Sequence, residues 1–125
     1  MEKKAEVRLS ANFERNLDSI EQFLLEAGVP WTFDILLDGL VEHVIPNLEQ
    51  YPTLGRLFLR RRQRSAEIKN ALAALRKLLG KGDELREYIW SDYLLLYLWN
   101  GDSIFLLSIK HHRQLFFDLK SLSKR

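Results

Sequence analysis

The apolar positions in the first fifty residues recur with the period of an α-helix. Within 11–27 they are spaced three and four residues apart, so they form one stripe of an amphipathic helix. Ser10 precedes the stripe and Gly28 follows it, as is typical of residues that begin and end helices. A second helix is predicted over 31–48 and should kink or loosen at Pro46, which lacks a backbone N–H. The very short turn between the two segments predicts a helical hairpin.

The hydrophobic pattern changes to that of β-strands in the last third of the chain. Segments rich in aromatic and aliphatic residues predict strands at 84–90, 93–99 and 103–111. Asn100-Gly101 between the last two is a strong hairpin signal, because both residues accept positive φ. Ser91-Asp92 separates the first two, so the three strands should form an antiparallel meander. A short alternating segment at 5–9 predicts a further strand before the first helix.

A long connection joins the hairpin to the meander. It begins with a loop at 51–56, and a third helix is predicted over 65–79. Between them lies a basic cluster formed by Arg60, Arg61, Arg62 and Arg64. These elements predict an α+β fold in which helices pack on one face of a small antiparallel sheet. The chain fits a single domain, 1–125, in which 57–83 is an extended connection containing the third helix.

Two-residue turns would divide the side chains of the meander between two faces, because side chains alternate along a strand. Tyr97 would then lie opposite Arg86 on one neighbour and opposite Ile104 on the other. One face is apolar except for Glu87 and should pack on the first two helices; it comprises Leu85, Ile89, Leu94, Leu96, Leu98, Phe105, Leu107 and Ile109. The other, which we call the aromatic face, comprises Arg86, Tyr88, Trp90, Tyr93, Leu95, Tyr97, Trp99, Ile104, Leu106, Ser108, Lys110 and His112.

The composition of the aromatic face is typical of a binding surface. Tyr, Trp and Arg are enriched in interfaces, and they also suit contacts with bases and phosphates. The alternative is that the third helix covers this face and makes it a second layer of the core. That alternative applies best to Leu95, Ile104 and Leu106. It applies least to Arg86 and Lys110, because charged groups are rarely buried without a partner.

Composition excludes several classes of protein. A hydrophobic content of 46% is too high for a disordered chain, and the absence of cysteine excludes disulfides, thiolate zinc sites and cysteine nucleophiles. The three histidines share no spacing on a common face, so neither a metal site nor a cofactor is expected. No secretory signal opens the sequence, and the longest apolar run, 93–99, is too short to cross a membrane. We therefore expect a soluble cytoplasmic protein with no membrane partner.

Charge is distributed unevenly along the sequence. Residues 1–50 carry four Lys/Arg against ten Asp/Glu, whereas residues 51–125 carry fifteen against seven. This asymmetry indicates that the second half meets a polyanion or an acidic partner. The alternative is that the two halves complement each other within one domain.

The order of these elements and motifs resembles the RelE/ParE superfamily of type II toxins. A strand and a helix hairpin are followed by the loop PTLGR, then by LREYIW, DYLLLYLWN and SIFLLSIKHHRQ. The similarity covers essentially the whole chain and is densest in 52–56 and 85–114. The stretch 57–83 is longer than the connection usual in compact members.

The resemblance implies a growth-arresting protein that a cognate antitoxin holds inactive. Antitoxins of this superfamily commonly wrap the toxin with an often acidic C-terminal segment, and operator DNA would be contacted only through the antitoxin. RelE-like members cleave messenger RNA in the ribosomal A site, whereas ParE-like members poison DNA gyrase. The ending IKHHRQ resembles the ParE branch and favours it. The alternatives are a RelE-like mRNA interferase and a non-toxic, degenerate member that acts as a binding protein.

The mRNA-interferase alternative requires a catalytic site without a metal. Attack by the ribose 2′-oxygen needs a general base, a general acid and cations that stabilise the developing charge. His112 on the aromatic face is the preferred acid or base, because His111 should point toward the helices. The cations would be Arg86, Lys110 and Arg113.

The favoured ParE-like interpretation requires contact residues in place of catalytic ones. The residues predicted to contact the antitoxin or the target are Arg56, Arg60, Arg61, Arg62, Arg64, Tyr88, Tyr97 and Trp99. His43 is most simply a residue of the helix surface.

Overall fold

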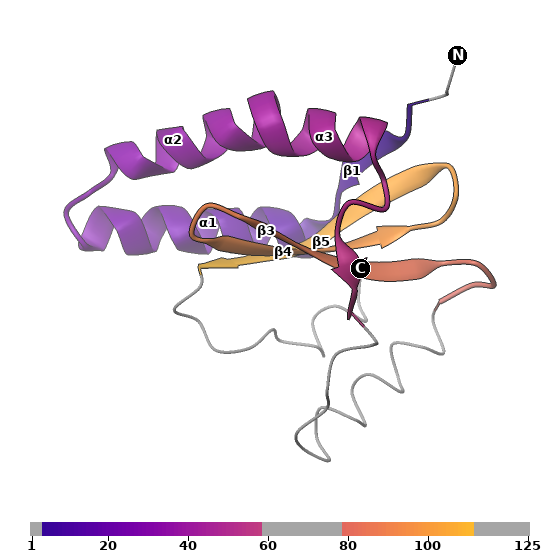
Figure 1. Ribbon diagram of the computed structural model, residues 1–125. Helices are drawn as coiled ribbons and strands as arrows, with labels where there is room; N and C mark the ends of the chain where they lie inside the picture. The colour runs from indigo at the N-terminus through magenta and orange to yellow at the C-terminus, as the bar shows by residue number, and fades with distance from the viewer. Residues whose placement is uncertain (1–3, 59–78, 112–125) are drawn as a thin grey trace.

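The computed structural model describes residues 4–58 and 79–111 (Figure 1). Its helices are α1 (Ala11–Glu26), α2 (Trp31–Gly39), the π-helix η1 (Leu40–Val44) and α3 (Ile45–Gln50). Its strands are β1 (Glu6–Leu9), β2 (Arg56–Leu57), β3 (Glu84–Trp90), β4 (Tyr93–Trp99) and β5 (Ser103–His111). The three strands of the meander have the predicted bounds. The predicted third helix lies outside the described residues except at its last position, Leu79.

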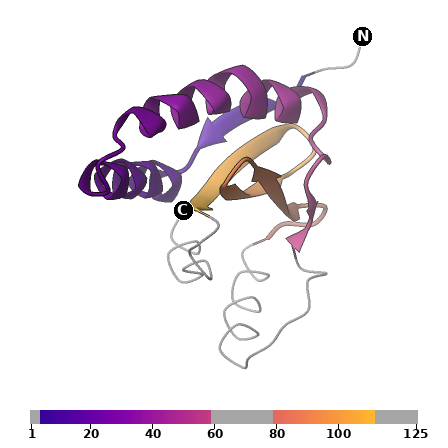
Figure 2. The same ribbon diagram turned by 60° about the vertical axis from the view of Figure 1, so that its left-hand side comes forward.

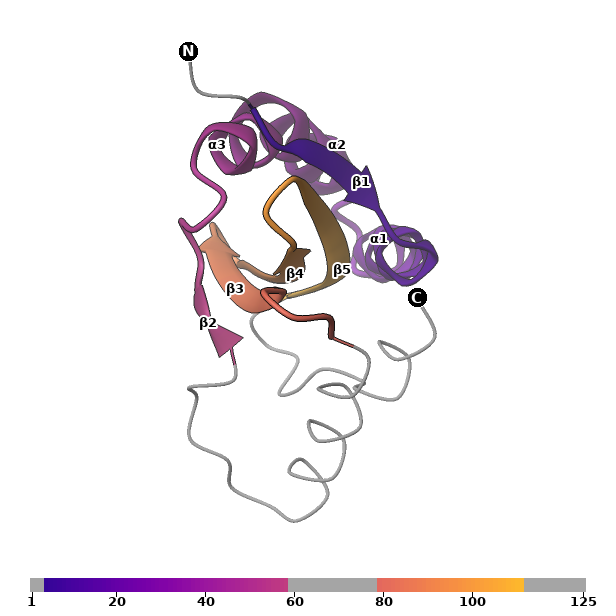
Figure 3. The ribbon, with the colours of Figure 1, turned by 90° about the vertical axis from the view of Figure 1, so that its right-hand side faces the viewer.

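The five strands form one mixed sheet with the helices on one face. Their order is β1-β5-β4-β3-β2, with β1 parallel to β5 and the other neighbours antiparallel. Figures 2 and 3 show the helices along one side of the sheet, with β1 and β2 at its two edges. The predicted α+β class is confirmed, but the sheet is mixed and not wholly antiparallel as predicted, because β1 pairs with β5 in parallel. The two-residue strand β2 was not predicted.

The helical hairpin follows the sequence signals closely. The Ser10 hydroxyl accepts a hydrogen bond from the Phe13 N–H at 3.1 Å and so caps α1. Gly28, with a φ of 80°, follows the end of α1. The second helix changes to a π-helical turn in η1, where the Ile45 N–H bonds to the Leu40 carbonyl, five residues earlier. The predicted loosening is therefore confirmed in the turn directly before Pro46.

The predicted register of the meander is correct for β3 and β4 and wrong for β4 and β5. Arg86 lies opposite Tyr97 between β3 and β4, as predicted. Between β4 and β5, Tyr97 lies opposite Leu106 and not Ile104. The reason is that Asn100 continues the ladder, with its N–H donating to the Ser103 carbonyl at 3.2 Å, so the turn moves one residue along.

A β-bulge in β5 changes which of its side chains face the helices. Leu106 lies opposite Tyr97 and Ser108 lies opposite Leu96, so Leu107 is an extra residue between the two pairs. Beyond the bulge, Ile109 belongs to the helix-side core. Strict alternation of side chains along β5 would have placed it on the face opposite the aromatic face.

The two faces of the sheet are the reverse of those predicted. The aromatic face packs on the helices, and its buried members are Tyr93, Leu95, Tyr97, Ile104 and Leu106. Four members of the predicted helix-facing set form a second buried cluster with Phe58 on the opposite face; they are Leu85, Leu96, Leu98 and Leu107. Ile89 of the same set is exposed.

Close packing between a helix and a ring explains this reversal. A Cβ atom at Gly39 would overlap with the ring of Trp90, so only glycine leaves α2 room for that ring. Both faces of the meander are apolar enough to be buried. Their hydrophobic pattern alone therefore does not decide which one the helices cover.

Two asparagines of α1 bind the bulge. The Asn12 amide donates to the Leu107 carbonyl at 2.9 Å. The Asn16 side-chain oxygen accepts from the Ile109 N–H at 3.1 Å and from the Ser108 hydroxyl at 3.0 Å. The backbone groups that the bulge removes from the strand ladder are thus satisfied by the helix, as buried polar groups require.

We predict that Asn16→Ala lowers the free energy of unfolding by about 1–3 kcal/mol, because it leaves the buried Ile109 N–H without its acceptor. Urea denaturation measures the change. Ser19→Ala is the matched control, since Ser19 is exposed on the same helix and should change stability by less than about 0.5 kcal/mol. Equal effects of the two substitutions would contradict the prediction.

Candidate functional site: the anchored loop and the helix-side pocket

The loop that carries the PTLGR motif is tied to the sheet by a buried tyrosine. The Tyr97 hydroxyl donates to the Pro52 carbonyl at 2.7 Å and accepts from the Gly55 N–H at 2.9 Å. Tyr97 is fully buried. Its polar tip is used inside the fold and the helices cover its ring, so Tyr97 lacks the exposure that was expected of a residue contacting an antitoxin or target.

Gly55 fits this site because nothing larger does. A Cβ atom there would lie 2.6 Å from the Glu87 carbonyl oxygen and 2.8 Å from a ring carbon of Tyr97. The close approach lets the loop lie directly on β3. The motif 52–56 is thus a docking element of the fold.

Arg86 is committed to the same loop. Its guanidinium donates to the Thr53 carbonyl at 3.1 Å and to the Gly55 carbonyl, and it bonds both carboxylate oxygens of Glu84, the nearer at 3.0 Å. Only 13% of the side chain is exposed. The guanidinium of Arg86 is therefore paired with Glu84 and the loop carbonyls, and little of its surface is accessible to an external phosphate.

Arg56 and Glu87 form a second ion pair beside the loop. The Arg56 Nε lies 2.6 Å from the Glu87 carboxylate, whose side chain is 1% exposed. The Arg56 side chain is 70% exposed, so it remains accessible while it neutralises the buried acid. Of the predicted contact residues that the structure describes, Arg56 is the most open to a partner.

The other predicted site residues divide into two groups. Tyr88 and Trp99 are half-buried and pack against the helix-side core, and Lys110 is half-buried on β5. The remaining ones lie outside the described residues; they are Arg60, Arg61, Arg62, Arg64, His112 and Arg113.

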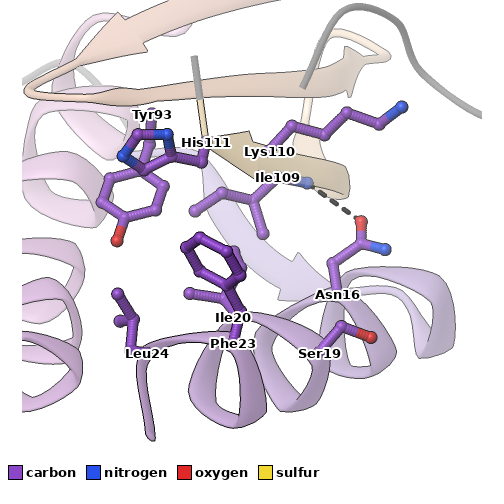
Figure 4. A pocket seen from close by; sticks show the side chains of 9 residues that line it. All are labelled: Asn16, Ser19, Ile20, Phe23, Leu24, Tyr93, Ile109, Lys110 and His111. Atoms are coloured by element: carbon purple, nitrogen blue, oxygen red, sulfur yellow. Dashed lines mark hydrogen bonds between the residues drawn. The ribbon is translucent and has the colours of Figure 1, made fainter. Parts of the chain in front are cut away.

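A pocket of about 340 Å³ lies between α1 and the end of the meander (Figure 4). It is lined by Asn16, Ser19, Ile20, Phe23, Leu24, Tyr93, Ile109, Lys110 and His111. The His111 and Tyr93 rings meet edge to face, with their centroids 5.5 Å apart. Burial, and then the nearby carboxylate of Asp92, raise the pKa of Tyr93 above 10.0.

The sequence analysis did not predict this pocket. His111 does point toward the helices, as predicted, but for a different reason. The helices cover the opposite face of the sheet from the one predicted, and the bulge turns His111 to that face. One usable signal was present: two asparagines, four residues apart, on the inner side of an amphipathic helix.

Two further findings bear on the kind of site. Within residues 4–58 and 79–111, no three His, Asp or Glu side chains gather in a way that could hold a metal ion. None of the helices in the described part of the chain is both long and apolar enough to span a membrane.

Comparison with known families decides the class of protein. A model of the ParE toxin of the type II toxin–antitoxin system, parDE, matches residues 7–116. The chain belongs to the ParE toxin family. A comparison with curated proteins finds no match.

Family membership makes this chain the toxin of a type II toxin–antitoxin system, with a cognate antitoxin as its partner. The match runs from the first strand to beyond the last one, so it includes the anchored loop and the pocket. Both features therefore lie within the matched residues.

We predict that Tyr97→Phe destabilises this ParE-family toxin by about 1–3 kcal/mol at neutral pH, because the Gly55 N–H loses its buried acceptor. Burial raises the pKa of Tyr97 above 10.0, although the Gly55 hydrogen bond and Arg86 lower it. The wild-type stability from this group is therefore complete below pH 10.0 and is lost as the pH rises through the higher pKa of the folded state. The variant should show a shallower alkaline decline.

Urea denaturation between neutral and strongly alkaline pH tests this prediction. Tyr51→Phe, at an exposed tyrosine, is the control and should leave both the stability and its pH dependence unchanged. Some alkaline decline should remain in Tyr97→Phe, since the pKa of Tyr93 is also raised. An identical pH profile for wild type and Tyr97→Phe would refute the role given to the buried hydroxyl.

Proposed function

We propose that this toxin arrests growth in the bacterial cytoplasm by binding and inhibiting DNA gyrase, and that its cognate antitoxin neutralises it. The family match supports the toxin, and the separation of Arg86 from His111 favours binding over RNA cleavage. Arg86 and Lys110 were the predicted cations that the structure describes, and His111 was the less favoured alternative to His112 as acid or base.

A metal-independent ribonuclease needs its cation and its acid or base around one phosphate. Arg86 lies opposite Tyr97, whereas His111 lies opposite Tyr93, four residues away along β4. At the rise of a β-strand this separates their backbones by about 13 Å along the sheet. Arg86 also faces Glu84 and the loop, so the pair does not form a catalytic centre.

The distribution of charge also favours a protein target over RNA. The described residues carry seven Lys/Arg and fourteen Asp/Glu, which would repel a polyanion. The two longer stretches outside them, 59–78 and 112–125, carry eleven Lys/Arg and two Asp/Glu. The basic excess of the second half is thus concentrated in these two stretches, which are suited to an acidic antitoxin.

We expect induction of the toxin without its antitoxin to stop DNA synthesis before protein synthesis. Pulse-labelling of both in the first minutes after induction measures the order. The purified toxin should also inhibit supercoiling by purified gyrase, and added antitoxin should restore it. Early loss of protein synthesis with cleaved mRNA would instead favour the interferase alternative, and the absence of any arrest would favour a non-toxic family member.

We expect the basic cluster to contribute to antitoxin affinity through charge. Replacing all four arginines with glutamine should weaken binding roughly ten- to hundredfold at low salt. These arginines are Arg60, Arg61, Arg62 and Arg64. The difference should shrink toward 1 M salt, where the Debye length is about 3 Å, and titrations at several ionic strengths measure it.

A matched variant controls for the overall loss of charge. It neutralises four exposed cations of the described body, Lys4, Arg8, Arg15 and Lys81. If the effect of the cluster is local, this variant should keep its antitoxin affinity and its salt dependence. Equal losses in both variants would show that only net charge matters.

A further inference from the structure

The outer side of α2 exposes two large apolar side chains that the fold does not use. Trp31 is 60% exposed and Ile35 is 61% exposed, whereas Phe33 and Leu36 of the same helix are buried. Trp31 and Ile35 are four residues apart, so they are neighbours on one face of the helix. In Figure 1 this helix runs along the edge of the molecule, with the sheet on its other side.

Acidic side chains continue this apolar pair along the helix. Asp38 and Glu42 follow Ile35 at helical spacing and are exposed, and Asp34 lies beside them. Residues 11–50 together carry eight Asp/Glu and one Arg. The exposed tryptophan and isoleucine are therefore bordered by uncompensated negative charge.

This combination selects among the possible partners. A symmetric contact with a second copy would bring the Asp38 and Glu42 carboxylates toward their own equivalents, which is unfavourable. An acidic antitoxin segment and a nucleic acid would be repelled in the same way. A basic protein segment is attracted, since its Lys or Arg side chains can pair with the carboxylates and stack on the Trp31 ring.

We propose that the outer face of α2, continued by Glu42 in η1, docks a basic protein segment, with Trp31 and Ile35 as apolar anchors and Asp38 and Glu42 as charged contacts. This inference rests on the proposed function, because the segment belongs to the target through which the toxin arrests growth. The docking face shares no residue with the basic stretches 59–78 and 112–125 that suit the antitoxin. The two regions differ in the sign of their charge.

Two double variants of α2 test the proposal, Trp31→Ala with Ile35→Ala, and Asp38→Lys with Glu42→Lys. All four side chains are exposed, so the fold should persist, and undiminished antitoxin affinity verifies this. Each variant should weaken growth arrest on induction. With purified gyrase as the probe, the concentration that half-inhibits supercoiling should rise about thirtyfold or more, as expected for loss of an interface hot spot.

The matched control is Asp18→Lys with Glu21→Lys, which makes the same change of charge on the exposed side of α1. It should arrest growth like the wild type. The proposal is overturned if the α2 variants remain fully toxic, or if the control loses as much activity as they do. It is also overturned if the α2 variants lose antitoxin binding in place of toxicity, because the face would then belong to the antitoxin.

The design separates this proposal from the proposed function. A wild-type toxin that arrests growth without inhibiting gyrase removes the gyrase target, while the arrest assay still decides the role of α2. A wild type that causes no arrest removes the proposed function, and the docking face with it.

Discussion

The junction between α1 and the bulge in β5 is the constraint on which the helix side of the structure depends. An extra residue at Leu107 would leave backbone groups unpaired inside the protein, and Asn12 and Asn16 supply the missing partners. The junction holds α1 against the sheet at a fixed register. It also turns Ile109 toward the helices, and without that rotation the pocket beside Tyr93 would lack one of its walls.

A second polar network ties the loop to β3 and β4 and limits what the site can do. Tyr97 and Arg86 both bond the loop 51–55, one with its hydroxyl and the other with its guanidinium. These buried hydrogen bonds favour one arrangement of loop and sheet, because moving the loop would break several of them, although the Arg86 Nε is buried without a partner among the described residues. The same bonds withdraw Arg86 from chemistry. The residue type that sequence reasoning associates with phosphate is here part of the scaffold.

The sequence predicted those features that depend on local pattern. Strand bounds, the Ser10 cap and the looser turn before Pro46 follow from periodicity and from residues with special backbone behaviour. The choice of sheet face did not follow, because leucines cover one face and aromatic rings the other, and both can be buried. That choice depends on contacts between distant residues, such as the Trp90 ring against Gly39. The bulge and the two-residue strand β2 are equally invisible, since neither leaves a periodic trace.

The same difference between local and distant information applies to the site. Arg86 and Tyr97 were singled out from the sequence as candidate site residues, but their partners lie some thirty to forty-five residues away in the loop. The sequence could therefore indicate that these residues matter without showing that they serve the fold. Arg56 differs because its side chain remains exposed while it pairs with Glu87, so it is accessible to a partner.

The distribution of charge connects the fold to its regulation. Phe58 and Leu79, where the described chain stops before 59–78 and resumes after it, both belong to the cluster on the sheet face opposite the helices. The described residues that flank the basic stretch thus lie on the far side of the sheet from α2. If the antitoxin binds that stretch and the target binds α2, the two do not compete for the same side chains. Neutralisation then requires an antitoxin that is long enough to extend around the edge of the sheet to α2, or bulky enough to exclude the target. The length of the bound antitoxin would thus determine whether the toxin is inhibited.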